Sequence, residues 1–223
     1  MSAPSLHVEL VLGSVDLSFD VPPGVTVLFG PSGAGKSRTL GAIAGLHRPE
    51  RGRIALGDEV WFDGESRLPI EQRRVAYVFQ SLALFPHLSA LDNVAYGVKG
   101  SKAERIARAE EMLSKMHVRE LAHRKPRTFS GGEAQRVALA RAFAMKPRVV
   151  LLDEPFSALD RAVKTELLRE VGEQLARENV PSILVTHQPE DAEILGDRVV
   201  FLERGRVERV ASMSEHPFGT PVK

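Results

Sequence analysis

The chain has 223 residues, with 30 Lys and Arg against 29 Asp and Glu, and it contains no cysteine. This balance of charge provides no strong field for nucleic acid or an anionic membrane surface, and the lack of cysteine excludes disulfides and cysteine zinc sites. The apolar runs fall far short of the roughly 20 residues that cross a bilayer, so we expect the chain to meet a membrane only through a partner. The N-terminus lacks the pattern of a secretory signal, so we expect the chain to stay in the cytosol.

The first 80 residues predict short strands and one helix. The strands are expected at 7–12, 15–21, 25–29, 53–56, 60–62 and 75–79. A helix is expected from Ser37 to Gly45, where the glycine ends it. Gly57-Asp58 separates two of the short strands, which favours an antiparallel layer beside the main sheet.

The middle of the chain is helical and the last third alternates. Residues 91–116 and 131–145 have helical patterns, and the second repeats apolar residues. After them come a strand at 148–152, a helix at 160–177, a strand at 182–186, a helix opened by Pro189, and strands near 198–203 and 206–210. We therefore predict one α/β domain over 1–223, with a mostly parallel sheet, an antiparallel layer and an inserted helical subdomain. The core is expected at about 1–80 and 147–223, and the helical subdomain at about 81–146.

A glycine loop lies between an apolar strand and a helix, as a phosphate-binding loop requires. Its residues are Gly30, Pro31, Ser32, Gly33, Ala34, Gly35, Lys36 and Ser37. The glycines let backbone N–H groups approach phosphate, Lys36 would neutralise the β- and γ-phosphates, and Ser37 would bind Mg²⁺. We count Arg38, the next residue, among the ATP-binding residues. The alternative is a chance glycine turn before a helix.

Polar residues at the ends of predicted strands supply the remaining chemistry. Asp153 and Glu154 end a run of four aliphatic residues. Asp153 suits a magnesium contact, and Glu154 suits a general base for the attacking water. Gln80 can place its amide beside the metal and water, and His187 can hydrogen-bond the γ-phosphate. Each has a plain alternative, since such residues also serve as ordinary polar ends of strands.

The segment Ser130, Gly131, Gly132 and Glu133 opens a helix. Serine followed three residues later by glutamate is an ordinary capping box. Two glycines in the first helical turn cost about 1 kcal/mol each, yet they expose N–H groups to phosphate. We therefore favour a second phosphate-facing helix N-terminus over a cap alone.

In this order, these motifs resemble those of the ATP-binding subunit of ABC transporters, and most closely of molybdate-type oxyanion importers. The likeness covers about residues 5–210 and includes Ser157 to Asp160. The resemblance implies a homodimer that sandwiches ATP and Mg²⁺, with Ser130–Glu133 of one copy facing the phosphate loop of the other and Asp160 in the dimer loop. It also implies an integral membrane permease, indirectly a solute-binding protein, and a peripheral location on the cytoplasmic face of the inner membrane.

The resemblance carries further expectations and some departures. Leu82, Leu84 and Phe85 are candidates for docking the permease, although they could equally pack inside the helical subdomain. Arg38 stands where the family usually has a small hydroxyl residue. No Tyr or Trp precedes the loop to stack on adenine, which leaves His7 or Phe19. We expect no carboxy-terminal oxyanion-sensing domain within these residues.

Three functions remain open from the sequence. The first is an importer ATPase for molybdate or another solute. The second is a soluble ABC ATPase of DNA repair or translation, which we rank lower because the chain has no coiled-coil insertion, paired cassette or basic stripe. The third is a kinase on the same phosphate loop, which leaves Ser130 and His187 without a role.

Overall fold

The structure, a computed structural model, describes residues 3–157, 159 and 161–219. Its main sheet has six strands in the order β10-β9-β3-β8-β7-β6. All neighbouring pairs are parallel except β10 with β9. The strands are β3 (Gly24–Phe29), β6 (Val75–Val78), β7 (Val149–Asp153), β8 (Pro181–Val185), β9 (Arg198–Glu203) and β10 (Arg206–Ser212). Strands β7 and β8 are buried at every position, which fits the apolar runs at 149–152 and 183–185 in the sequence.

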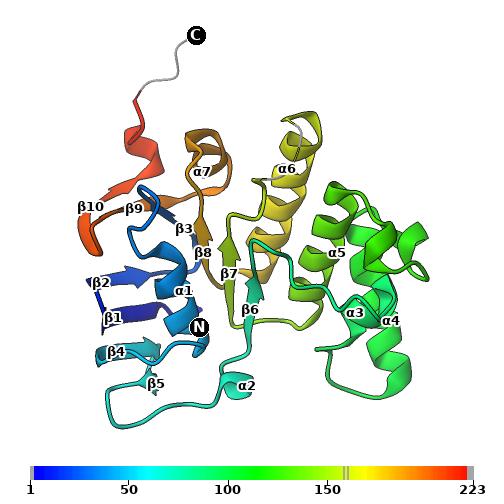
Figure 1. The fold of residues 1–223 in the computed structure, drawn as a ribbon, viewed down its shortest axis with the longest axis horizontal. Coiled ribbons are helices and arrows are strands. Elements are labelled where there is room, and N and C mark those ends of the chain that lie inside the picture. Colours follow the sequence, from blue (N-terminus) through cyan, green and yellow to red (C-terminus); the bar gives the residue numbers. More distant parts are fainter. Residues whose placement is uncertain (1–2, 158, 160, 220–223) are drawn as a thin grey trace.

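A second, antiparallel sheet has the order β2-β1-β4-β5. Its strands are β1 (Leu6–Leu12), β2 (Val15–Val21), β4 (Arg51–Leu56) and β5 (Glu59–Phe62). Strand β2 alternates buried and exposed residues along its whole length, as expected when one face of a sheet packs on a core. Helix α1 (Lys36–Ala44) shares one apolar cluster with both sheets, and Figure 1 shows it beside them.

Of the remaining helices, α3, α4 and α5 build the part to the right in Figure 1, α6 and α7 lie beside the main sheet, and α2 lies below the sheets. They are α2 (Ile70–Arg73), α3 (Ala90–Ala95), α4 (Lys102–Lys115), α5 (Gly131–Ala144), α6 (Arg161–Glu178) and α7 (Pro189–Leu195). Three 3-10 turns lie at Arg119–Leu121, Pro126–Thr128 and Met213–Glu215. Within the described ranges, none of these helices combines the length and hydropathy needed to span a membrane.

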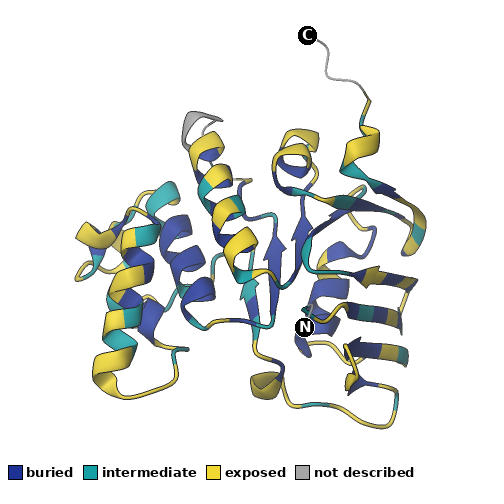
Figure 2. Ribbon diagram, turned by 180° about the vertical axis from the view of Figure 1, so that it is seen from behind, coloured by how far each residue is buried: buried dark blue, intermediate teal, exposed yellow. Residues whose placement is uncertain are grey.

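The α/β fold class is confirmed, and two local predictions differ from the structure. The predicted helix at 91–116 is two helices, because Gly100 has a φ of 122° and Ser101 starts α4 with its own capping box. Sequence patterns missed the single turn α2. Helix α5 is buried on nearly all sides, as Figure 2 shows, because it packs against α3, α4, α6 and β6.

A buried arginine ties α1 to the antiparallel sheet. Arg73 is only 1% exposed, and its guanidinium donates to the carbonyls of Ala42, Ile43, Trp61 and Leu68 at 2.8–3.2 Å. Burial lowers the pKa of Arg73 to about 10. The charge is thus spread over four carbonyls, two of which lie at the end of the helix that carries the glycine loop.

We predict that Arg73→Ala lowers the free energy of unfolding by about 3 kcal/mol, because buried acceptors lose a charged donor. The exposed neighbour Gln72→Ala is the matched control, with an expected change within about 0.5 kcal/mol. Urea unfolding measures both. Equal values for the two variants would contradict the role of Arg73.

Candidate functional site

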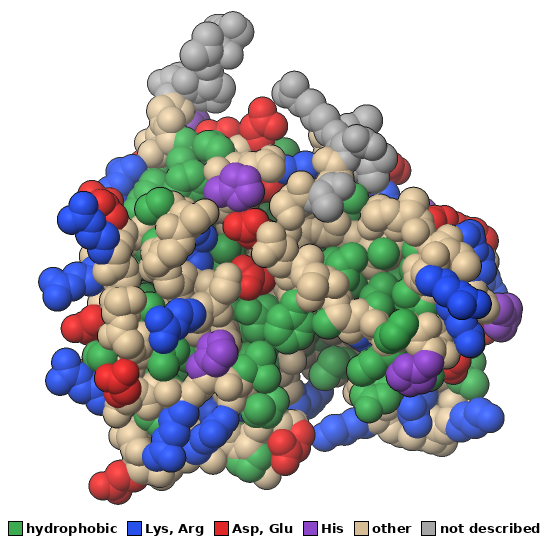
Figure 3. Space-filling view, viewed as in Figure 1, with side chains coloured by type: hydrophobic (Ala, Val, Ile, Leu, Met, Phe, Trp, Pro, Cys, Tyr) green, Lys and Arg blue, Asp and Glu red, His purple; other side chains and the backbone are tan. Residues whose placement is uncertain are grey.

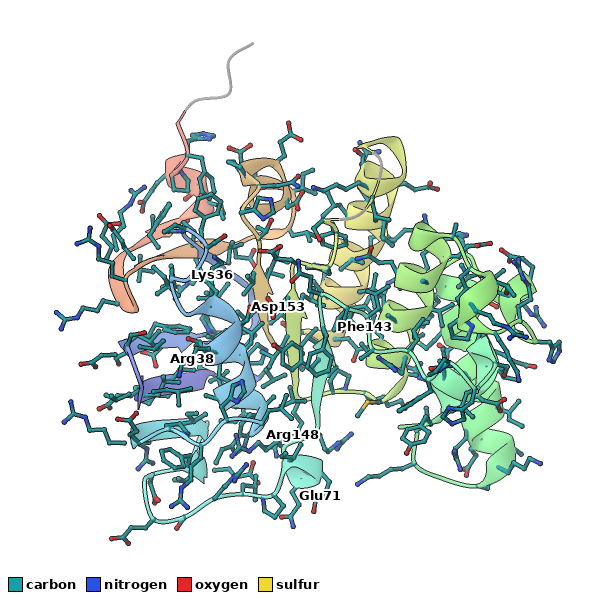
Figure 4. All side chains as sticks on the ribbon, viewed as in Figure 1. Lys36, Arg38, Glu71, Phe143, Arg148 and Asp153 are labelled. Carbon is teal, nitrogen blue, oxygen red and sulfur yellow. The ribbon has the colours of Figure 1, made fainter. Side chains whose placement is uncertain are left out.

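The candidate site lies where four adjacent parallel strands end. Strands β3, β8, β7 and β6 are neighbours in the sheet, and their carboxyl ends lead to the glycine loop, His187, Asp153-Glu154 and Gln80. Ligands of open α/β sheets bind at this edge. Figure 4 shows Lys36 and Asp153 close to each other there.

The glycine loop leaves the start of α1 free of a side-chain cap. Gly35 is the N-cap with a φ of 96°, no side chain caps it, and the first turn has no acidic residue. A Cβ at Gly35 would stand 2.5 Å from Cγ2 of Val15, so the loop approaches β2 more closely than another residue permits. Ser32, Gly33, Gly35, Lys36, Ser37, Arg38 and Glu154 line a hollow of about 250 Å³. This open helix N-terminus fits a phosphate group.

Lys36 is held inside the loop. Its ammonium donates to the carbonyl of Gly30 at 2.8 Å and to that of Pro31 at 2.9 Å. Burial lowers the pKa of Lys36, and the carboxylates of Glu154 and Asp153 act in the opposite direction. The cation is therefore placed for phosphate charge before any ligand arrives.

Ser37 and Asp153 supply the oxygens that Mg²⁺ prefers. Ser37 Oγ donates to Asp153 Oδ1 at 3.0 Å, and Tyr77 Oη donates to Oδ2 at 3.1 Å. Asp153 is 7% exposed, and burial raises its pKa despite these two bonds. The described residues hold no group of three or more His, Asp or Glu that could bind a metal alone. The pair therefore suits an ion that also takes phosphate oxygens.

Glu154 lies between the other two predicted catalytic residues. Gln80 Nε2 donates to its Oε2 at 3.3 Å, and His187 Nδ1 lies 3.5 Å from its Oε1. Glu154 has a φ of 47°, which is unusual for a residue with a side chain, and its N–H is fixed to the carbonyl of Val185 at 3.0 Å. Such strain concentrates at functional sites. In the structure, Gln80 contacts this carboxylate rather than Ser37 or Asp153.

The sequence analysis missed two residues behind His187. Lys164 Nζ lies 2.6 Å from Asp191 Oδ1, and both side chains are at least nine-tenths buried. Thr186 Oγ1 donates to Asp191 Oδ2 at 3.2 Å and accepts from the N–H of Gln188 at 3.1 Å. This chain of contacts fixes the backbone on both sides of His187. Lys164 and Asp191 are far apart in sequence, so no local motif marks them.

A further residue that no local motif marks, Arg141, joins α5 to the segment after Gln80. Its guanidinium donates to the carbonyls of Leu82 and Ala83 at 2.8 and 2.7 Å, and it lies 5.6 Å from the centre of the Phe85 ring. Leu82 and Ala83 have φ values of 60° and 44°. This segment is thus strained and held by the helix that begins at Ser130.

The Ser130 segment forms the capping box and does not line the hollow. Ser130 Oγ accepts from the N–H of Glu133 at 3.3 Å, and Glu133 Oε2 accepts from the N–H of Ser130 at 2.6 Å. These bonds lower the pKa of Glu133. The ordinary capping interpretation is therefore realised within one chain. The phosphate-facing interpretation remains a prediction that requires a second copy.

Neither of the two rings suggested for adenine lines the hollow, and one predicted residue is not described. Phe19 is 6% exposed and packs in the core shared by α1 and the antiparallel sheet. His7 Nδ1 lies 2.7 Å from Asp20 Oδ1, and neither ring lines the hollow. Asp160 lies outside the described residues. In the register of β1 and β2, Phe19 pairs with Val8 and His7 pairs with Asp20, so the two rings project from opposite faces of the sheet. The sequence pattern alone does not relate this register to the loop.

Comparisons with known proteins assign these features to a family. The family model described as "ABC transporter" matches residues 15–157. The chain is 44% identical over 220 residues to the sulfate/thiosulfate import ATP-binding protein of Mesorhizobium japonicum, covering 95% of this chain and 60% of that protein. It is 40% identical over 227 residues to the Fe(3+) ions import ATP-binding protein of Pseudomonas fluorescens, covering 97% and 64%. The chain thus spans about three fifths of the length of these relatives.

Solved structures share the fold. The dimeric structure of MJ0796, described as a bacterial ABC transporter cassette, superposes with a TM-score of 0.81 at 27% identity, covering 93% of this chain and 98% of that one. A post-hydrolysis state of the same cassette, bound to ADP and Pi, gives 0.82 at 28% identity with the same coverage.

We predict that Asp153→Asn stabilises the ligand-free protein near neutral pH. Burial raises the pKa of Asp153 above its ordinary 3.8. The free energy of unfolding of the unsubstituted protein therefore falls as the pH rises from 3.8 through the raised pKa, because the folded state ionises this carboxyl less readily than the unfolded state does. The variant lacks this loss of stability. Urea unfolding of both proteins at about pH 4 and about pH 8 should show its advantage growing with pH.

The control is Asp58→Asn in an exposed turn. Its free energy of unfolding should differ from that of the unsubstituted protein by the same amount at both pH values. An advantage of Asp153→Asn that is absent at high pH would contradict the cost assigned to this buried carboxylate.

Proposed function

Because the chain belongs to the ABC transporter family, we propose that it is the ATP-hydrolysing subunit of an importer and works as a homodimer on a membrane permease. The observation that supports hydrolysis most directly is the Glu154 carboxylate, which lies between Gln80 and His187 at the edge of the hollow. A base in that position faces the terminal phosphate of a nucleotide seated in the glycine loop.

The proposed chemistry assigns one task to each group. The N–H groups of the loop and the Lys36 ammonium bind the triphosphate, while Ser37 and Asp153 hold Mg²⁺, which neutralises phosphate charge when bound. Glu154 accepts a proton from a water molecule while the water oxygen attacks the γ-phosphorus. The bond between the γ-phosphorus and the oxygen that stays on ADP breaks. Gln80 orients the water, and His187 donates to the γ-phosphate.

The proposed dimer uses the Ser130 segment of each copy on the other copy's nucleotide. The capping box satisfies the N–H groups of Ser130 and Glu133, and no side chain in the described part caps those of Gly131 and Gly132. A Cβ at Gly131 would meet nothing within 4 Å. The glycine is therefore not required by this chain's own packing, which supports a ligand or partner that approaches it closely.

The proposed permease surface lies beside the segment after Gln80. Leu82 and Leu84 pack against the core of this chain, so we keep only Phe85 of the three docking candidates. The centre of the Phe85 ring lies 4.5 Å from that of Tyr96, tilted by 43°, and Tyr96 is 62% exposed. The residues after Tyr96 line a hollow of about 410 Å³, whose charged lining residues are Glu71, Arg74, Lys99, Glu104, Arg108 and Lys146. Figure 3 shows Lys and Arg side chains around a depression on this side.

The proposed cargo is an inorganic ion. The two relatives named above are import proteins for sulfate or thiosulfate and for Fe(3+), so molybdate has no support from them. We propose a location on the cytoplasmic face of the inner membrane, through the permease. Purification with the membrane partner tests this proposal: a binding protein loaded with sulfate, molybdate or Fe(3+) should stimulate ATP hydrolysis. A chain that purifies without a membrane protein, and that no solute stimulates, would favour the soluble ATPases.

We predict that Glu154→Gln binds ATP as tightly as the unsubstituted protein and loses at least about a hundredfold in turnover, the typical contribution of a general base. Calorimetry measures binding, and phosphate release measures turnover. Glu173→Gln on the exposed face of α6 is the control and should hydrolyse normally. Undiminished hydrolysis by Glu154→Gln would remove Glu154 from the role of base.

We also predict that Gly131→Glu, in the Glu154→Gln background, abolishes ATP-dependent dimerisation without destabilising the monomer. The side chain enters open space and favours the helix N-terminus, but it would collide with a partner's phosphates. Light scattering with Mg²⁺ and ATP measures the mass. Lys102→Glu is the matched control, because α4 begins with the same capping box and Lys102 occupies the same position. Dimers of both variants would contradict the arrangement.

A further inference from the structure

The hollow at the glycine loop contains no aromatic side chain among its described lining residues. The two rings expected from the sequence are engaged elsewhere, since Phe19 is buried and His7 contacts Asp20. A nucleotide that is held only by its phosphates leaves its base in water. The described residues around the loop must therefore supply another planar group if the base is to be bound.

Arg38 is such a group. It lies in the first turn of α1, lines the hollow and is exposed. Its guanidinium lies against the turn between β1 and β2: a Cβ at Gly13 would stand 3.0 and 3.2 Å from its two terminal nitrogens. No hydrogen bond or ion pair engages this guanidinium in the described part of the chain. The turn itself is fixed by the N–H of Gly13, which donates to Glu50 Oε1 at 2.9 Å.

The position of Arg38 matches the nucleoside end of the ligand. Figure 4 shows Asp153 on the main-sheet side of Lys36 and Arg38 on the side of β1 and β2. If the terminal phosphate faces Glu154, next to Asp153, the nucleoside leaves the loop on the opposite side. That side carries the guanidinium and the Gly13 turn beneath it.

Resting on the proposed function, we propose that the Arg38 guanidinium stacks on the nucleotide base and replaces an aromatic ring as its platform. Guanidinium planes stack on bases, and the cation adds attraction to the ring face. Glycine at position 13 leaves room for the guanidinium against the turn, since a Cβ there would stand only 3.0 Å from its nearer terminal nitrogen. Every base has a ring face on which a guanidinium can stack, so this contact does not distinguish adenine from guanine. The dissociation constants of ATP and GTP should therefore agree within about threefold.

Equilibrium calorimetry with Mg²⁺ tests the stacking with two ligands, ATP and inorganic tripolyphosphate, which has no base. Arg38→Ala should weaken ATP binding about tenfold, the size of one stacked base, and change tripolyphosphate binding less than about twofold. Arg38→Lys keeps the charge without the plane and should also lose most of the ATP affinity. Arg177→Ala, on the exposed face of α6, is the control and should change neither.

Each other outcome overturns the inference. If Arg38→Ala loses equal affinity for ATP and for tripolyphosphate, Arg38 binds the phosphates through its charge and does not stack on the base. Full ATP affinity in Arg38→Lys would lead to the same conclusion. Unchanged ATP binding in Arg38→Ala overturns the stacking alone, because the unsubstituted protein still binds ATP. An unsubstituted protein that does not bind ATP overturns the proposed function and this inference together.

Discussion

The carboxyl ends of four neighbouring parallel strands meet at one edge of the main sheet, and the candidate site depends on this convergence. The strands follow the order β3-β8-β7-β6 in space, so segments from the beginning, middle and end of the chain become adjacent. Strands β7 and β8 are buried at every position, β3 is buried at its four central residues, and β6 is buried at alternate residues. A short polar segment at the end of each strand can then be held to within hydrogen-bond distance of the next one.

The same edge collects charge that the fold itself does not fully neutralise. Lys36 is buried against loop carbonyls, and Asp153 is buried against two hydroxyl donors. Burial shifts the pKa of each group towards its neutral form. A ligand that brings phosphate and a divalent cation would compensate the charges of Lys36 and Asp153 together. Without it, the folded protein retains the free-energy cost of burying these two charges.

The two helix N-termini of the proposed mechanism differ in a way that explains their roles. Helix α1 begins without a side-chain cap inside the hollow, whereas α5 begins with a complete capping box on the surface. Arg141 on α5 holds the strained segment after Gln80, whose amide contacts Glu154. Contacts of Gln80 and Arg141 thereby join the proposed permease surface to the Glu154 carboxylate and to α5.

The sequence by itself determined the strand and helix types, the glycine loop, and Asp153, Glu154, Gln80 and His187 as polar ends of strands, because these depend on local spacing and periodicity. Only the tertiary structure decided what those residues contact. Tyr77 contacts Asp153, while Lys164, Asp191 and Arg141 hold the segments beside His187 and Gln80. His7 and Phe19 project from opposite faces of the β1–β2 pair, and neither lines the hollow. Contacts between distant segments are set by packing of the whole sheet, and no local pattern records them.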